Sequence, residues 1–331
     1  MKLIIILIAI SFTLFPQQKY FNLGDFNVSK GGVIKNAMLG YRTVGKLNQD
    51  SSNAIIFPAW FGGRSKTVAI LTGPDKFADS TKYFVILPDP FGNGVSSSPS
   101  NYTGGEFPEV TMEDNIRAQY RLVTEELKLK GLFAGIGGSM GGMQMFQWAV
   151  QYPGFIKKIV PYVGTPKQGA SNKLLYQAAI NQVLVGRKYN MPEKDILPLL
   201  NMYQYFLGRT PEWVENNTAP EKVDSMLNAF FAPDTVTFPS GNWLTQMTMM
   251  RDHDITKNFN GSLEEAAKAI KSDMLIIVSD SDLLVYNGKA KEIAGYLDAP
   301  LVVLKGDCGH LQPSCELAYV ADVIKKFLGE K

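Results

Sequence analysis

Residues 137–142 read Gly-Gly-Ser-Met-Gly-Gly, which sets Ser139 between close-packed glycines at the end of an apolar run. The apolar run, Leu132–Ile136, predicts a short buried strand, and Met143–Tyr152 predicts a helix. A serine on so tight a strand-to-helix turn has a strained backbone and a hydroxyl that projects above the sheet. Glycines two residues before and two after it let the neighbouring chain approach without Cβ clashes. The pattern is that of a nucleophile elbow, although such a turn can also be only a tight connection.

Apolar runs of strand length recur along the chain, with helical segments between them. They cover residues 54–57, 83–87, 132–136, 159–163, 274–278 and 301–304. Continuous apolar runs are typical of strands that are buried on both faces, as in parallel sheets. Helices with one apolar face are predicted over 111–128 and 316–328, and a leading hairpin over 20–48. The alternation predicts an α/β fold with a mostly parallel central sheet flanked by helices.

The strand pattern stops between residues 169 and 260. This stretch contains helical segments rich in methionine and aromatic residues, and prolines interrupt it. We predict a helical cap inserted into a core made of residues 18–168 and 261–331. Its large apolar side chains are expected to form core between cap and sheet; alternatively, some of them line an adaptable apolar pocket.

The composition bounds the class of function. The chain has 331 residues, 45% of them apolar, and a formal net charge of +2. That charge is too small for the basic field that nucleic-acid binding needs, so nucleic acid is not an expected partner. A small-molecule substrate fits better, and the sequence also permits a homodimer.

The N-terminus has the features of an export signal. Lys2 precedes about a dozen apolar residues, too few for a bilayer span of roughly 20. We predict a signal peptide over residues 1–17 and a periplasmic or secreted protein. No small-x-small pair marks the cleavage site, which leaves open an uncleaved interfacial anchor or a buried first strand. The protein would be cytoplasmic if this segment is not a signal.

Cys308 and Cys315 lie seven positions apart, on either side of His310. In an oxidising compartment they could form a disulfide that closes a small loop around the histidine. In a reducing compartment they would be two free thiols.

A serine hydroxyl needs a base to remove its proton, and the chain has two histidines. His310 follows the strand at 301–304 near the C-terminus, where the base belongs when the order is serine, acid, histidine. His253 precedes the strand expected to carry the acid, so we expect it to be a polar surface or cap residue. A metal role for His253 is not expected because no further ligand cluster accompanies it. The sequence predicts no metal and no cofactor.

The acid should follow the strand at 274–278. Asp280 and Asp282 both qualify. Asp282 is favoured because the intervening loop carries it clear of the strand end, and Asp280 would then be a turn residue bonding its own backbone.

An oxyanion hole needs two backbone N–H groups aimed at the charge of a tetrahedral intermediate. One donor is expected from Met140, the residue after the nucleophile. The other is expected from Trp60, in the glycine-containing loop 58–63 after the first buried strand. A packing role for the Trp60 side chain is compatible with a backbone donor.

With Ser139, Asp282 and His310 in place, the chain resembles the homoserine O-acetyltransferase branch of the α/β-hydrolase superfamily. The likeness runs from about residue 21 to the C-terminus and is strongest over 54–166. The matching stretches are 137–144 with 148–149 and 152–153, then 107–108 with 110–111, and 115–119. Residues 91–101 are similar to relatives described only as α/β-fold hydrolases. The resemblance implies an α/β-hydrolase fold with an inserted helical cap.

Two departures from the acetyltransferase pattern bear on the substrate. The family implies an aspartate after the catalytic histidine, holding the amino group of homoserine, whereas this chain has Leu311. The family also implies a cap arginine for the homoserine carboxylate, and the sequence does not assign one within 169–241. An exported enzyme would also lack acetyl-CoA.

The sequence therefore predicts a serine-dependent acyl-transfer enzyme, foremost an ester or thioester hydrolase that forms an acyl-enzyme on Ser139. The alternative within the same chemistry is an O-acyltransferase, such as homoserine O-acetyltransferase, that uses acetyl-CoA. A catalytically silent binding module on the same fold is the alternative from another class. A nucleotide-binding protein is disfavoured because Met140 stands where the Gly-x-Gly-x-x-Gly pattern needs its third glycine.

Overall fold

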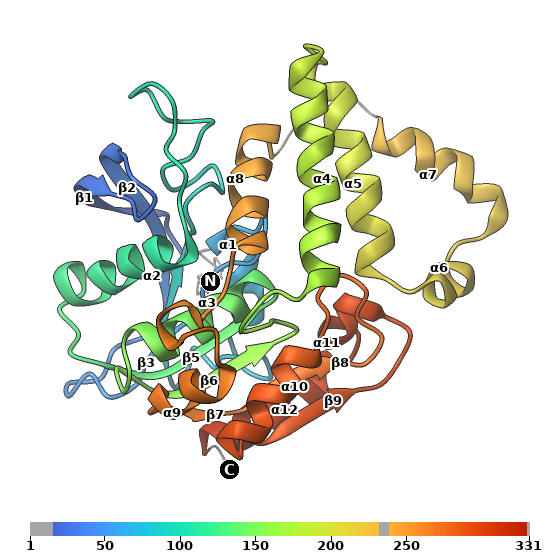
Figure 1. Ribbon diagram of the computed structural model, residues 1–331. Coiled ribbons are helices and arrows are strands. Elements are labelled where there is room, and N and C mark those ends of the chain that lie inside the picture. The colour runs from blue at the N-terminus through green and yellow to red at the C-terminus, as the bar shows by residue number, and fades with distance from the viewer. Residues whose placement is uncertain (1–15, 232–237, 330–331) are drawn as a thin grey trace, which may run out of the picture.

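The apolar runs form the strands of one sheet in the computed structural model, which describes residues 16–231 and 238–329 (Figure 1). The strands are β1 (Lys19–Asn27), β2 (Val33–Val44), β3 (Ala54–Ile56), β4 (Phe84–Pro88), β5 (Leu132–Gly138), β6 (Ile156–Tyr162), β7 (Asp273–Met274), β8 (Ile276–Ser279) and β9 (Leu301–Leu304). Each predicted strand is found close to its expected bounds. The run at 274–278 is divided at Leu275, whose N–H bonds to Ile159 O of β6 before the chain turns to pair with β9.

The strand order places the ends of four strands at one edge of the sheet. The order is β1-β2-β4-β3-β5-β6-β8-β9, with β7 also pairing with β6. β1, β2 and β4 pair antiparallel, and the pairs from β4 to β9 are parallel. The carboxyl ends of β3, β5, β8 and β9 therefore lie at the same edge. The loops after these strands carry the predicted site residues, so the topology gathers them there.

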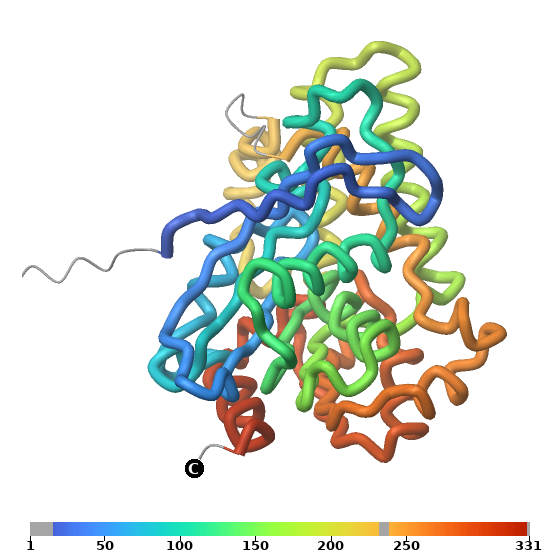
Figure 2. The backbone as a smooth tube through the Cα atoms, turned by 90° about the vertical axis from the view of Figure 1, so that its left-hand side faces the viewer, coloured from blue at the N-terminus to red at the C-terminus, as the bar shows by residue number. Residues whose placement is uncertain are grey.

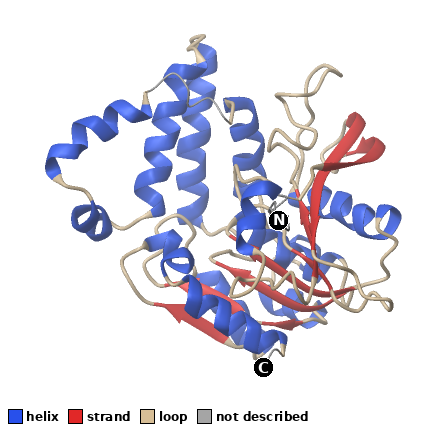
Figure 3. Ribbon diagram, turned by 180° about the vertical axis from the view of Figure 1, so that it is seen from behind, coloured by secondary structure: helices blue, strands red, loops and turns tan. Residues whose placement is uncertain are grey.

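Helices cover both faces of the sheet (Figure 3). They are α1 (Ser65–Val68), α2 (Met112–Arg121), α3 (Met140–Gln151), α4 (Ala170–Lys188), α5 (Glu193–Gly208), α6 (Pro211–Asn217), α7 (Val223–Phe230), α8 (Ser240–Arg251), α9 (Leu263–Ala269), α10 (Gly288–Leu297), α11 (Gln312–Cys315) and α12 (Leu317–Leu328). α2, α3, α9 and α10 pack on one face, and α1 and α12 on the other. Consecutive residues of β3 show why the runs are continuous: Ile55 faces one cluster and Ile56 the other, and both are fully buried. The α/β fold predicted from the sequence is confirmed.

Thr111 is the N-cap of α2, at the predicted start of this helix. Its side chain accepts from Asp114 N, and the Asp114 side chain accepts from Thr111 N, which makes a capping box. The regular helix is shorter than the predicted 111–128, because the chain continues from Leu122 to Glu126 as a π-helical turn.

Between β6 and β7 the described chain is helical, and we call residues 169–260 the cap segment. α4 and α5 stand upright beside α8, with α6 and α7 beyond them (Figure 1). An antiparallel bridge between Lys167 and Asp254 joins the points where the chain leaves and re-enters the core. The division into core and cap domains stays a prediction.

The hairpin of β1 and β2 lies against the loop after β4 (Figure 2). Met38 N and Gly40 N donate to the hydroxyls of Ser97 and Ser96 at 2.9 and 2.8 Å. Most of the predicted signal peptide, residues 1–15, lies outside the described residues. Within residues 16–231 and 238–329, no helix has the length and apolarity needed to cross a bilayer.

Candidate active site

Ser139 lies on the turn that joins β5 to α3. Its backbone has φ 55° and ψ −122°, a conformation that L-residues rarely adopt. The residue is held there on both sides: its N–H donates to Tyr162 O, and its C=O accepts from Met143 N. Such strain persists only where the surroundings enforce it, and it is found preferentially at functional sites.

The glycines around Ser139 are required by close packing. A Cβ on Gly137 would lie 2.2 Å from Gly141 O, and one on Gly138 would lie 2.1 Å from the ring of Tyr162. Both distances are far below van der Waals contact. The serine therefore sits on a turn that no larger neighbours could form.

His310 contacts the two other predicted catalytic side chains. Its Nε2 lies 2.9 Å from Ser139 Oγ, and its Nδ1 lies 2.7 Å from Asp282 Oδ2. The side chains of His310 and Asp282 are 8% and 1% exposed. The structure thus brings His310 together with Ser139, 171 positions earlier, and with Asp282, 28 positions earlier.

The two candidate acids in the loop after β8 have different partners. Asp282 Oδ1 accepts from Leu284 N at 2.9 Å and Val285 N at 2.8 Å, which leaves Oδ2 for the histidine. Asp280 is exposed, and its carboxylate accepts from Lys291 Nζ at 2.8 Å rather than from its own turn. The hydrogen bond from Lys291 holds the pKa of Asp280 below its usual value.

The two residues expected to supply the oxyanion donors are the neighbour of Ser139 in the chain and a residue of the same cavity wall. Met140 is the first residue of α3, so its N–H has no acceptor within the helix. Trp60 lines the same cavity as Ser139. Its loop is fixed from two sides: Gln144 Nε2 donates to Ala59 O at 3.0 Å, and Gly62 N donates to Gln246 Oε1 at 2.8 Å.

Gln144 belongs to a buried amide network that sequence reasoning did not single out. Its Oε1 accepts from Asn115 Nδ2 at 2.9 Å and from Gln119 Nε2 at 2.5 Å. Gln119 Oε1 in turn accepts from Trp148 Nε1 at 2.9 Å. The network joins α2, α3 and the Trp60 loop. The available signal was a set of polar side chains on otherwise apolar helix faces, within stretches quoted above for the family resemblance.

A cavity of about 430 Å³ opens over Ser139 and His310. Aromatic and aliphatic side chains from core and cap segment make most of its wall, among them Phe61, Phe77, Tyr162, Tyr176, Tyr203, Phe230, Trp243, Met247 and Met250. Some of the cap methionines and aromatics thus line a pocket, while others, such as Met249, are core. Burial raises the pKa of Tyr162 and Tyr176. Tyr176 donates its hydroxyl proton to Leu284 O at 3.4 Å.

Arg209 is an arginine of the cap segment at the cavity, and the sequence did not single it out. It follows α5 and lines the cavity, with its guanidinium 4.5 Å from the ring centre of Tyr205 and 4.7 Å from that of Trp213. Gly309 allows the backbone of Arg209 to pack against the segment that carries His310, because a Cβ on Gly309 would lie 3.0 Å from Arg209 Cα. Leu311 also lines the cavity, at the position next to His310.

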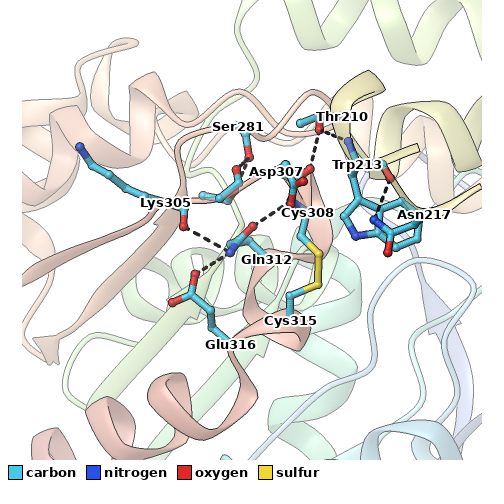
Figure 4. Close-up of a disulfide and its surroundings, with 12 residues drawn as sticks. Thr210, Trp213, Asn217, Ser281, Lys305, Asp307, Cys308, Gln312, Cys315 and Glu316 are labelled. Atoms are coloured by element: carbon cyan, nitrogen blue, oxygen red, sulfur yellow. Dashed lines mark hydrogen bonds between the residues drawn. A yellow bond between two sulfur atoms is a disulfide. The ribbon is translucent and has the colours of Figure 1, made fainter. Parts of the chain in front are cut away.

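Cys308 and Cys315 are joined in a disulfide whose ring contains His310 (Figure 4). Cys308 directly precedes the short 3₁₀ helix Gly309–Leu311, and Cys315 ends α11.

His253 contacts none of the three predicted catalytic side chains. The sequence predicts a surface or cap residue; it is 1% exposed, so the surface position is wrong, and it lies in the cap segment. Its Nε2 lies 3.1 Å from Thr165 O, and its Nδ1 has no hydrogen-bond partner among the described residues. The backbone acceptor explains its burial, because a neutral imidazole can donate one proton to it. In the part of the chain that the structure describes, no group of three His, Cys, Asp or Glu side chains could hold a metal ion.

Burial lowers the pKa of His253 to about 4, and the carboxylates of Glu113 and Asp254 only partly oppose this. The folded-state pKa lies below the unfolded value of 6.5, so the stabilisation from neutral His253 is complete above pH 6.5. It is lost as the pH falls from 6.5 towards 4, at up to about 1 kcal/mol per pH unit. We expect the stability difference between wild type and His253→Gln to shrink over this range in urea unfolding. A difference that does not change with pH would contradict this account.

The parallel sheet, the strained serine turn and the histidine after the last strand define an α/β-hydrolase. Residues 55–313 match the family model described as the alpha/beta hydrolase fold. The chain belongs to this family.

Two relatives show the range of activities nearby. A probable esterase of Corynebacterium glutamicum is 28% identical over 309 residues, covering 88% of each chain. A homoserine O-acetyltransferase of Methanococcus vannielii is 29% identical over 352 residues, covering 92% of this chain and 71% of that one. The chain is an α/β-hydrolase enzyme by these relationships.

Solved structures agree on the fold. An acetylester hydrolase from Corynebacterium glutamicum superposes with a TM-score of 0.85 at 24% identity, covering 95% of this chain and 96% of that one. At this identity the likeness supports the architecture alone.

Proposed function

We propose that this protein is a serine esterase that hydrolyses small acyl esters through an acyl-enzyme on Ser139. The observation that carries the proposal is the pair of contacts made by His310, 2.9 Å to Ser139 Oγ and 2.7 Å to Asp282 Oδ2. These contacts have the geometry that a nucleophile, its base and the base's orienting acid require.

The first half-reaction begins with proton transfer from Ser139 Oγ to His310 Nε2 as the oxygen attacks the ester carbonyl. Asp282 Oδ2 accepts a hydrogen bond from the Nδ1–H group of His310, which fixes the tautomer and stabilises the imidazolium that forms. The N–H groups of Trp60 and Met140 donate to the oxyanion. His310 then protonates the leaving alcohol, and the acyl group remains on the serine.

In the second half-reaction water attacks the acyl carbonyl and gives a proton to His310 Nε2. The bond from the carbonyl carbon to Ser139 Oγ then breaks, His310 returns the proton to Oγ, and the carboxylic acid leaves. An acyltransferase must instead bind its acceptor alcohol well enough to compete with water. Leu311 supplies no charge for an ammonium group at the position next to the base. This favours water as the acceptor over an amino alcohol such as homoserine.

O-acyl transfer remains the second candidate, and Arg209 is the observation that favours it. A guanidinium at the cavity wall is suited to a carboxylate on an acceptor or on the ester itself. The cavity over Ser139 therefore offers Arg209 to a carboxylate. Among the described residues that line it, no carboxylate is available to bind an amine.

Product analysis separates the two candidates. Purified protein is given p-nitrophenyl acetate, and separately acetyl-CoA, each with and without homoserine. We expect acetate as the product of p-nitrophenyl acetate, at a rate that homoserine does not change. O-acetylhomoserine formed from acetyl-CoA would overturn the preference for hydrolysis, and the absence of any turnover would favour a silent binding module.

Leu311→Asp tests whether this position limits transfer. A carboxylate there could hold the ammonium group of homoserine through a charge-assisted hydrogen bond, worth a change of about tenfold in the ratio of transfer to hydrolysis. Leu311→Asn is the matched control, because it has the same shape without the charge. The ratio is measured from O-acetylhomoserine and acetate in one reaction, and equal ratios in both variants would refute the charge argument.

We further propose export through residues 1–17, which a disulfide beside the candidate base supports because disulfides persist in oxidising compartments. Self-association stays a prediction that sedimentation can test.

A further inference from the structure

We propose that the Cys308–Cys315 disulfide positions His310 for catalysis, so that reduction by a dithiol lowers turnover while the fold is retained. This inference rests on the proposed role of His310 as the base. It assigns to the disulfide a part in the reaction rather than in stability alone.

The ring closed by the disulfide holds more than the histidine. Leu311, Pro313 and Ser314, which follow His310 within the ring, line the cavity. A change in the course of this ring would therefore move the base and one wall of the substrate cavity together.

The chain just ahead of the ring is fixed from two directions (Figure 4). Ser281 Oγ donates to Gly306 O at 2.6 Å, which ties this chain to the loop that carries Asp282. Thr210 Oγ1 donates to Asp307 O at 2.5 Å, which ties it to the cap segment. Both of these ties precede Cys308.

The chain after the ring is fixed by the core. Cys315 is followed by α12, whose Val320 and Ile324 are fully buried against the sheet. The disulfide thus links the segment held by Ser281 and Thr210 to the start of α12, across the loop that carries His310. It shortens the free chain around the base to the eight-residue ring itself.

Hydrogen bonds of the Gln312 side chain form a non-covalent link parallel to the disulfide, and Leu311 N also donates to Cys308 O within the ring. Gln312 Oε1 accepts from Cys308 N at 3.0 Å, and Gln312 Nε2 donates to Glu316 Oε1 at 2.5 Å. This link and α12 survive reduction, so we expect the fold to persist. Hydrogen bonds restrain the loop less than a covalent bond, and a displacement of the base by about 1 Å can cost a factor of roughly 100 in rate.

The chemistry is thiol–disulfide exchange. A dithiol such as dithiothreitol attacks one sulfur, the S–S bond breaks, and Cys308 and Cys315 each end as a thiol with one proton. The reductant closes to its own disulfide, which balances the two electrons. Cys315 is exposed whereas Cys308 is buried, so attack is expected at the sulfur of Cys315.

The kinetic test compares oxidised wild type, dithiothreitol-treated wild type and the double variant Cys308→Ser/Cys315→Ser. We expect kcat for p-nitrophenyl acetate to fall by about tenfold or more in the last two samples, with an unchanged far-UV spectrum. Dithiothreitol should not affect the double variant, which controls for other effects of the reductant. If oxidised wild type itself shows no turnover, the proposed function fails. The positioning of His310 by the disulfide is then tested by the second readout alone.

A second readout does not depend on activity. The chain has two histidines, so ring ¹H–¹⁵N spectra contain two sets of signals, and His253→Gln assigns them. We expect reduction to broaden the Nδ1–H signal of His310 and to leave the Nε2–H signal of His253 unchanged. An unchanged His310 signal and kcat, with a lower melting temperature, would overturn the proposal and leave the disulfide a purely stabilising role. If the double variant does not fold, the dithiothreitol-treated wild type decides by the same two measurements.

Discussion

Replacing Ser139 by alanine is expected to lower kcat/KM for p-nitrophenyl acetate by about 10⁴- to 10⁶-fold. Alanine removes the oxygen that we propose forms the acyl-enzyme but keeps the backbone strain at φ 55°, because both residues have a Cβ. The cavity, the histidine and the oxyanion donors remain in place. The melting temperature should therefore change little while turnover is lost.

A fluorophosphonate probe measures the same point directly. It should label wild type at Ser139 and leave Ser139→Ala unlabelled. Ser314 is the matched control, because its hydroxyl also lies at the cavity but is not the serine that His310 contacts. Ser314→Ala should be labelled like wild type, whereas labelling that persists in Ser139→Ala would remove the basis of the enzyme mechanism proposed above.

Asp282→Asn is expected to lower kcat by about 10⁴-fold. The asparagine keeps the shape of the side chain and an oxygen for the N–H groups of Leu284 and Val285. Its NH₂ group then faces His310 Nδ1 as a donor, which favours the tautomer with the proton on Nε2. In that tautomer Nε2 cannot accept the proton of Ser139.

The neighbouring aspartate provides the control for this variant. Asp280→Asn loses only an exposed ion pair with Lys291, which solvent screens. Steady-state kinetics should show turnover within about twofold of wild type. The opposite pattern, with activity lost in Asp280→Asn and kept in Asp282→Asn, would show that the acid is misassigned.

The elbow was predictable from sequence because its requirements are local. Gly137 lies where a Cβ would clash with Gly141, four residues further on, and the apolar run of strand length before it indicates a buried strand. His310 was found by elimination and order, since the chain has two histidines and one of them follows the last strand. Local pattern and chain order therefore sufficed for these two residues.

The support of the Trp60 loop could not be read in the same way. Gln144 reaches Ala59 across 85 positions and Gln246 reaches Gly62 across 184, and neither spacing leaves a periodic trace in the sequence. The burial of His253 was missed for a similar reason. Its partner, Thr165 O, is a backbone atom 88 positions away, and any residue type would have supplied it.

The sequence alone determined the α/β architecture, the position of Ser139 and the order in which its partners follow, because hydrophobic periodicity and glycine sterics act within a few residues. Only the tertiary structure decided which of Asp280 and Asp282 meets His310, and that Arg209 reaches the cavity wall. These outcomes depend on how loops from separate strands and the cap segment meet in space. No short-range rule of chain geometry fixes that meeting.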